Sequence, residues 1–172
     1  HPMEPALIDK FKCFPNIMVH NSAETMRKFI DDGIRGIFIC GEQDMLESYI
    51  IAKIWDEPTQ DLDDLLQEFF ARYFGAAARP MQDFYAEIED IATDADNYQP
   101  PCYKKNSIDW KNVAWTQLGT EERMAKLGQH IAAAEALAQT DAEKEHVARW
   151  RKALWQWMLD GRAEYLAKTA HP

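Results

Sequence analysis

The sequence predicts a mainly α-helical protein, a helical bundle or array with one or two short β-strands. Two features of the chain predict this fold class. Beyond residue 58, apolar residues recur at the three- and four-residue spacing of helices, whereas the strongest strand-like run, residues 34–40, stands alone. With 172 residues, 47% of them hydrophobic, the chain is long enough to bury one substantial core.

The chain before residue 34 is expected to be a loop followed by a short helix. Residues 1–20 contain three prolines and no sustained apolar period, so they predict an ordered loop with a short extended piece at residues 17–20. Asn21 and Ser22 are good helix caps, and the apolar stripe that follows them ends at Gly33. We therefore expect an amphipathic helix between these points.

Residues 34–40 form the strongest predicted strand. The run is almost continuously apolar, which is typical of strands buried on both faces of a parallel sheet. From about Gln43 the period becomes helical, and Pro58 ends that helix. Because an apolar strand needs cover for its backbone and its side chains, we expect it to pair with residues 14–20 or with a second copy, or to lose strand character.

Helices are predicted for most of the chain that follows. The clearest one begins after a cap at Asp61 and ends at Gly75. The next helix places Pro80 near its first turn, which is where a helix tolerates proline. A polar segment, residues 93–112, then predicts a long loop.

The C-terminal part of the chain predicts a helical hairpin. One helix is expected over about residues 120–139. The last helix is capped by Thr140, with Glu143 three residues later in the spacing of a capping box. Packing these two helices as a hairpin on the preceding pair would bury their apolar stripes.

Composition and charge exclude several classes of function. The formal net charge of −10 argues against a nucleic-acid surface, which needs clustered Lys and Arg. The chain has no run of 18 apolar residues, so no membrane span is predicted, and its N-terminus does not resemble a signal peptide. Cys13, Cys40 and Cys102 are widely spaced and the histidines lack ligand-spaced partners, so we expect neither a metal nor a cofactor.

Three polar residues are the first candidates for a site. Glu42 follows the predicted strand directly, where (β/α)8 barrels present site residues, although acidic residues are also favoured in the first turn of any helix. Asp44 is interpreted as a helix cap. His20, on the loop before the first helix, is a candidate for the same rim, with a structural role as the alternative. No catalytic residue is assigned in this chain.

Aromatic side chains are the second set of candidates. The chain has six tryptophans, and flat aromatic faces stack on sugar rings. Core packing explains three that lie at helical spacing: Trp55, Trp150 and Trp157. Trp110 and Trp115 lie in or next to the polar loop, so we expect them to be freer for contact with a ligand.

Four pieces of the sequence, "CFPNI", "DGIRGIFICGE", "YIIAKIWDEP" and "LDDLLQEFFARYFGAAARPM", resemble a family of unknown function. Its members are glycoside-hydrolase-like barrel proteins, loosely related to α-glucuronidases. The resemblance covers roughly residues 10–92 and implies that residues 22–56 are the last helix, strand and helix of a (β/α)8 barrel. Residues 1–57 would then be a barrel remnant, and residues 58–172 an α-helical C-terminal domain.

The resemblance also implies a function. The parent protein would hydrolyse glycosidic bonds with two carboxylates from earlier strands, so this chain alone is expected to be inactive. Glu42 matches the family's acidic residue after the last strand, with a substrate-binding or supporting role, and His20 would lie at the pocket rim. The implied partners are a carbohydrate and the missing barrel, or a second copy, covering residues 34–40. Family relatives of this kind often act in the secreted or cell-envelope fraction.

A non-catalytic helical binding or interaction module is the alternative interpretation. In this case the tryptophans and the acidic helix faces would contact a protein or glycan partner. A contiguous exposed aromatic patch around Trp110 and Trp115 would distinguish this module from a barrel fragment.

Overall fold

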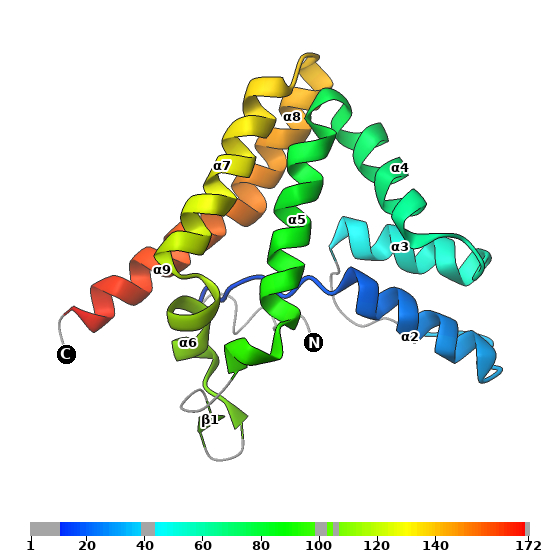
Figure 1. The fold of residues 1–172 in the computed structure, drawn as a ribbon, viewed down its shortest axis with the longest axis horizontal. Coiled ribbons are helices and arrows are strands. Elements are labelled where there is room, and N and C mark those ends of the chain that lie inside the picture. The colour runs from blue at the N-terminus through cyan, green and yellow to red at the C-terminus, as the bar shows by residue number, and fades with distance from the viewer. Residues whose placement is uncertain (1–10, 39–43, 99–102, 105–106, 171–172) are drawn as a thin grey trace.

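The computed structural model describes residues 11–170, apart from residues 39–43, 99–102 and 105–106 (Figure 1). Helices make up most of the described chain, which confirms the predicted mainly α-helical class. In chain order the α-helices are α2 (Val19–Asp31), α3 (Met45–Asp56), α4 (Leu62–Phe74), α5 (Ala78–Thr93), α6 (Trp110–Val113), α7 (Glu121–Leu137), α8 (Asp141–Trp150) and α9 (Gln156–Thr169). Short helical turns accompany them: η1 (Gly75–Ala77), η2 (Ala95–Tyr98), η3 (Ala114–Leu118) and η4 (Arg151–Trp155).

The C-terminal helices form the predicted hairpin. α7 packs against α8, and α8 continues through the π-helical turn η4 into α9. In Figure 1, α8 and η4 run back alongside α7, and α9 continues past the start of α7 toward the C-terminus. α5 packs on both α4 and α7 and thereby joins the hairpin to the rest of the molecule. No described helix is both long and apolar enough to cross a membrane.

Several helix ends follow the local signals that predicted them. The side chain of Asp61 accepts a hydrogen bond from the Asp64 N–H at 3.1 Å. Thr140 and Glu143 form the reciprocal bonds of a capping box at the start of α8. α4 ends at Gly75, whose φ of 53° favours glycine. These ends were predictable because each depends on residues close in sequence.

The start of α2 differs from its prediction. The helix begins at Val19, so Asn21 and Ser22 lie inside it. The extended piece expected at residues 17–20 is therefore wrong for residues 19–20, which are helical. The residue at the cap position, Met18, has no side chain that can bind the free N–H groups. Carboxylates from other helices bind them instead, and such contacts are not visible in local sequence.

The described part of the predicted strand, residues 34–38, has no regular secondary structure. It follows the turn that ends α2, and no main-chain hydrogen bond joins residues 35–38 to another described residue. Within this single chain, residues 34–38 therefore lack strand character. Pairing with a second copy, the remaining expected outcome, stays a prediction. The rest of the run lies outside the described residues.

The described β structure lies elsewhere, in the polar loop. Strands β1 (Tyr103–Lys104) and β2 (Ser107–Ile108) form a short antiparallel hairpin. η2 and α6 flank this hairpin, so the segment predicted as a long loop contains several short ordered pieces. Pairing of the predicted strand with residues 14–20 is wrong for the described residues, because residues 14–18 are irregular and the helix begins directly after them.

One cluster of buried side chains extends across the predicted domain boundary at residue 57. α3 packs against both α2 and α4. The ring of Tyr49 on α3 lies 5.4 Å from the ring of Phe69 on α4, measured between centroids. The two predicted parts therefore share a core in the described chain, and the division at this boundary stays a prediction.

Two glycines with positive φ allow a matched test of the α4 terminus. A Cβ atom at Gly75 would collide with the Glu143 carboxylate, whereas a Cβ at Gly33, where φ is 78°, would meet open space. We expect Gly33→Ala to lower the free energy of unfolding by about 1 kcal/mol through backbone strain alone. Gly75→Ala should lower it further, because Glu143 must also leave the Thr140 capping box. Equal losses in urea unfolding would contradict this role of Gly75.

Candidate functional site

The described candidate site is a group of carboxylates where α2 meets α3 and α5. It consists of Asp44, Glu47 and Glu89, here called the carboxylate junction. Asp44 and Glu47 belong to the start of α3, and Glu89 lies on α5. His20, one of the sequence candidates, contacts Glu89 of the junction. In the sequence, Asp44 comes two residues after Glu42, another candidate.

Glu89 attaches the first turn of α2 to α5. One carboxylate oxygen accepts the main-chain N–H of His20 at 2.8 Å, and the other lies 2.9 Å from Nδ1 of the same residue. Glu89 is only 8% exposed, although the imidazole of His20 is largely exposed. A carboxylate at a helix N-terminus is favoured by the helix dipole, so Glu89 acts as a cap supplied by another helix.

Glu47 attaches the same end of α2 to α3. Its Oε1 accepts the main-chain N–H of Met18 at 3.3 Å and the hydroxyl of Ser22 at 3.1 Å. Met18 is the cap residue of α2 and provides no cap of its own. Glu47 and Glu89 therefore satisfy polar groups that the α2 sequence leaves unbound.

Asp44 connects α3 to α5. Its Oδ1 accepts the Leu46 N–H at 2.8 Å, which confirms the interpretation of Asp44 as a helix cap. Its Oδ2 accepts the hydroxyl of Tyr85 at 3.0 Å. Tyr85 lies one turn before Glu89 on α5, so the same face of α5 binds both α2 and α3.

Burial makes the charged forms of these groups less favourable. It raises the pKa of Asp44, although bonds from Leu46 N–H and the Tyr85 hydroxyl act in the opposite direction. Burial also raises the pKa of Glu47, and the nearby charges of Asp44 and Glu89 add to this effect. Burial, followed by the charge of Asp44, raises the pKa of Tyr85 well above its ordinary value.

The contacts indicate that the junction holds helices together. None of the ion pairs between described residues joins Asp44 or Glu47 to a lysine or arginine, and Glu89 is paired only with His20. The carboxylate oxygens of the junction instead accept hydrogen bonds from main-chain N–H groups at helix ends and from a serine and a tyrosine hydroxyl, and one lies against a histidine ring nitrogen. Within the described part of the chain, no group of three or more His, Cys, Asp or Glu residues is placed to hold a metal ion.

The sequence candidates lie in different places. His20 belongs to the carboxylate junction through its bonds to Glu89. Glu42 lies outside the described residues. Trp110 begins α6 and is 44% exposed, and its role as a ligand contact stays a prediction.

The expectation for Trp115 was wrong. This side chain is only 4% exposed, and its indole Nε1 donates a hydrogen bond to the carbonyl of Lys12 at 3.0 Å. It lies in η3, packed under the chain that precedes α2, and this long-range contact is why its position next to a polar loop was misleading. The two candidate tryptophans therefore do not form one exposed patch.

Two carboxylates of the junction were missed in the sequence. Glu89 carried a detectable signal, because it lies four residues after Tyr85 and three before Ala92, on the apolar stripe of α5. A charge on a stripe that faces the core needs a buried partner. Glu47 had no comparable signal, since an acidic residue in the first turn of a helix is ordinary.

The raised pKa of Glu47 predicts how its neutral analogue behaves. A carboxylate whose folded pKa is raised stabilises the fold in its protonated form, and this contribution is lost as pH rises through the folded pKa. Glu47→Gln keeps an oxygen for the Met18 N–H and the Ser22 hydroxyl. We therefore expect this variant to be more stable than the parent at about pH 7.5, with a gain that shrinks toward about pH 4.

Urea unfolding across this pH range measures the effect. Glu122→Gln, on the exposed face of α7, is the matched control and should change stability by no more than about 0.5 kcal/mol. A Glu47→Gln variant that is less stable than the parent at neutral pH would show that the negative charge itself is needed to hold α2.

Comparisons were made with models of protein families, with curated proteins and with solved structures. None of the three gave a match to this chain. The function is therefore inferred from the residues and contacts of the chain itself.

Proposed function

We propose that this chain is the C-terminal part of a glycoside-hydrolase-like protein that acts on a carbohydrate. In this proposal, residues 1–57 complete a (β/α)8 barrel, residues 58–172 form the helical domain after it, and the catalytic carboxylates belong to polypeptide outside this chain. The four sequence pieces that resemble the barrel family are the starting point. The exposure of the segment between α2 and α3 is the structural observation that supports it.

This segment places large apolar side chains in solvent. Phe38 is 89% exposed and Ile34 is 39% exposed, although both belong to the most strand-like run of the chain. Exposing apolar surface of this kind costs free energy that burial would recover, at about 25 cal/mol per Å². Large apolar side chains that are exposed close together in the chain are often covered by another part of a protein.

An open groove next to the segment extends the apolar surface. It has a volume of about 650 Å³ and lies between residues 36–37 and one face of α3. Its α3 side is lined by Ile51, Ala52 and Trp55, with Ser48 and Asp56 also on this face. A neighbouring strand or helix of a barrel would cover both the groove and Phe38, which is the arrangement that the family resemblance implies.

The contacts of the carboxylate junction are compatible with catalytic carboxylates that lie outside this chain. Glycoside hydrolysis needs two carboxyl groups on opposite sides of the scissile bond, with space for the sugar between them. Glu47 and Glu89 instead bind the first turn of α2, and Asp44 binds Leu46 and Tyr85. In this proposal the junction holds together α2 and α3, the last helices of the barrel, while other residues carry out the reaction.

Because Phe38 is exposed in this chain, the effect of replacing it should differ between this chain and a longer protein that covers it. In this 172-residue chain, Phe38→Ser should change the free energy of unfolding by no more than about 0.5 kcal/mol, because the ring is in solvent. In a protein extended at its N-terminus by the polypeptide that its gene encodes there, the same change should cost about 1.5–3 kcal/mol. Chemical denaturation of both proteins measures the difference.

Leu166→Ser on α9 is the matched control, because Leu166 is 45% exposed and remote from the segment. It should have the same small effect in both proteins. The extended protein should also hydrolyse aryl glycosides, whereas the 172-residue chain should not. A Phe38→Ser variant that is neutral in both proteins would remove the structural support for a covering barrel.

A non-catalytic glycan-binding module is the second candidate, and one observation favours it. Trp110 is exposed, and the ring of Tyr98 packs edge-on against it with 6.0 Å between centroids, which holds the indole in place. The buried position of Trp115 removes the wider patch that this function was expected to use.

Calorimetric titration with oligosaccharides tests the module. We expect Trp110→Ala to weaken binding by about threefold or more, and Trp110→Phe, which keeps a flat ring, to weaken it less. Circular dichroism should show an unchanged helical fold for both variants, because Trp110 is at the surface. A parent chain that releases no heat with any oligosaccharide would rule out Trp110 as a glycan contact.

A further inference from the structure

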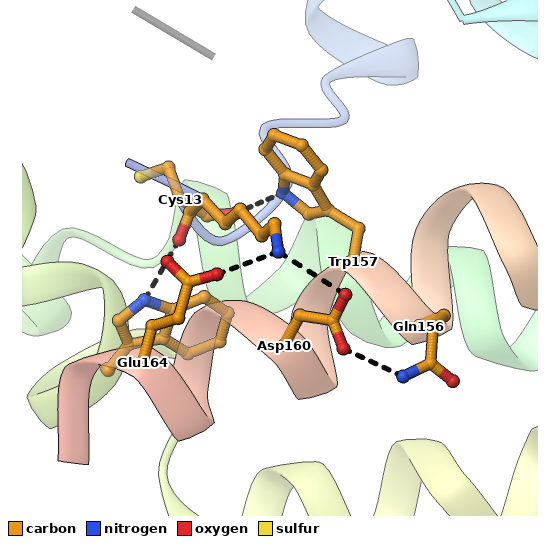
Figure 2. A network of polar contacts seen from close by, with 7 residues as sticks. Cys13, Gln156, Trp157, Asp160 and Glu164 are labelled. Carbon is orange, nitrogen blue, oxygen red and sulfur yellow. Dashed lines mark hydrogen bonds and ion pairs between the residues drawn. The ribbon is translucent and has the colours of Figure 1, made fainter. Parts of the chain in front are cut away.

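Residues 11–17, here called the N-terminal strap, lie across the last helix of the chain (Figure 2). The strap has no regular secondary structure, yet three of its residues, Cys13, Phe14 and Ile17, are buried. An irregular segment that is this well covered needs partners for its main-chain polar groups. α9 and η3 provide several of them.

Two tryptophans bind consecutive main-chain carbonyls of the strap. The indole Nε1 of Trp115 donates to the carbonyl of Lys12 at 3.0 Å, and the indole Nε1 of Trp157 donates to the carbonyl of Cys13 at 2.9 Å. Figure 2 shows Trp157 projecting from α9 toward Cys13. Bonds to carbonyl oxygens recognise an extended chain whatever its side chains are.

An acidic pair on α9 adds recognition of a lysine. Nζ of Lys12 lies 2.8 Å from Glu164 Oε1 and 3.3 Å from Asp160 Oδ2. The two carboxylates are four residues apart and therefore lie on one face of the helix. Gln156 donates to the other oxygen of Asp160 at 2.8 Å and so holds this carboxylate toward the strap.

The apolar part of the contact adds an aromatic preference. The ring of Phe14 is 4% exposed and packs edge-on against Trp115, with 6.2 Å between the ring centroids. Phe14 follows Lys12 by two residues. The acidic pair and the face of Trp115 are thus spaced for a lysine followed two positions later by an aromatic ring.

Gly161 gives the strap room to approach α9. A Cβ atom at this position would lie 2.6 Å from the Lys12 carbonyl oxygen and 2.5 Å from Cζ2 of Trp115, distances that real Cβ atoms do not adopt. Glycine inside a helix costs about 1 kcal/mol relative to alanine. The cost is explained by the close passage of the strap.

We propose that η3 and α9 form a recognition groove for an extended peptide that carries a lysine followed two residues later by an aromatic ring. In this chain the N-terminal strap occupies the groove. The inference does not depend on the proposed carbohydrate function. It makes the strap a releasable attachment between the polypeptide before α2 and the end of the helical array, held by side chains that can recognise the same segment when it is offered as a separate peptide.

The thiol of Cys13 reports release of the strap. It is buried, and burial raises its pKa to about 11, so it should react slowly with a disulfide reagent while the strap is bound. In the full chain with Cys40→Ser and Cys102→Ser, we expect Gly161→Ala to accelerate labelling of Cys13 by about tenfold or more. Gly128→Ala is the matched control, because a Cβ there meets only the Trp155 ring, at 3.1 Å. Equal labelling rates in the two alanine variants would overturn the proposal.

A peptide supplied in trans tests recognition directly. Lys12→Glu in the full chain places a third carboxylate beside Asp160 and Glu164, which should free the groove while the helices stay folded. A fluorescent peptide of residues 10–18, with Ser at position 13, should then bind this variant with a dissociation constant of about 10–1000 μM by anisotropy. The parent chain should bind it at least about tenfold more weakly, because its own strap competes at a high effective concentration.

Two controls make the outcome specific to the groove. Adding Gly161→Ala to the Lys12→Glu variant should abolish peptide binding, because the close approach is lost. A peptide with Lys12→Ala should bind more weakly, and raising the salt concentration should reduce the difference between the two peptides. A folded Lys12→Glu variant that does not bind the peptide, or that binds it equally well with Gly161→Ala, would refute a recognition groove on α9.

Discussion

The position of α2 depends on carboxylates that reach its first turn from other helices. A helix leaves its first N–H groups without internal partners, and Met18, at the cap position, cannot bind them. Glu47 from α3 and Glu89 from α5 accept bonds there instead. Because α2 leads directly into residues 34–38, these two side chains also determine where the exposed apolar segment lies.

These carboxylates are held mainly by helix termini. The chain carries a formal net charge of −10, and no ion pair between described residues gives Asp44 or Glu47 a lysine or arginine. The partial positive charge at a helix N-terminus takes the place of a cation: that of α3 for Asp44, and that of α2 for Glu47 and Glu89. The raised pKa of Glu47 indicates that this compensation is incomplete, which is expected when three carboxylates share a partly buried junction.

The sequence was a good guide where structure depends on near neighbours. The caps at Asp61 and Thr140, and the end of α4 at Gly75, each involve residues a few positions apart, so their patterns were readable. It failed for the start of α2 and for Trp115, whose partners are distant in the chain. The local sequence cannot distinguish an exposed tryptophan beside a polar loop from one that is covered by a segment distant in the chain, as Trp115 is.

The candidate site was predicted in part for the same reason. Asp44 was identified as a cap from its position before a helix. His20 was predicted at a pocket rim, which stays a prediction, and its bonds to Glu89 fit the structural alternative. Glu47 was missed because its partners, Met18 and Ser22, belong to a different helix end. Only Glu89, a charge on an otherwise apolar face of α5, carried a signal that points to a buried contact.

The two segments that flank α2 show how this chain treats apolar irregular structure. The strap before α2 is covered: indoles of η3 and α9 bind its carbonyls, and Gly161 lets it approach closely. The segment after α2 is comparably apolar, yet Phe38 is 89% exposed, next to an open groove on α3. The two segments thus differ in cover: side chains of η3 and α9 bury the strap, whereas Phe38 after α2 remains exposed. The exposure of residues 34–38 is therefore the observation on which the proposed covering partner depends.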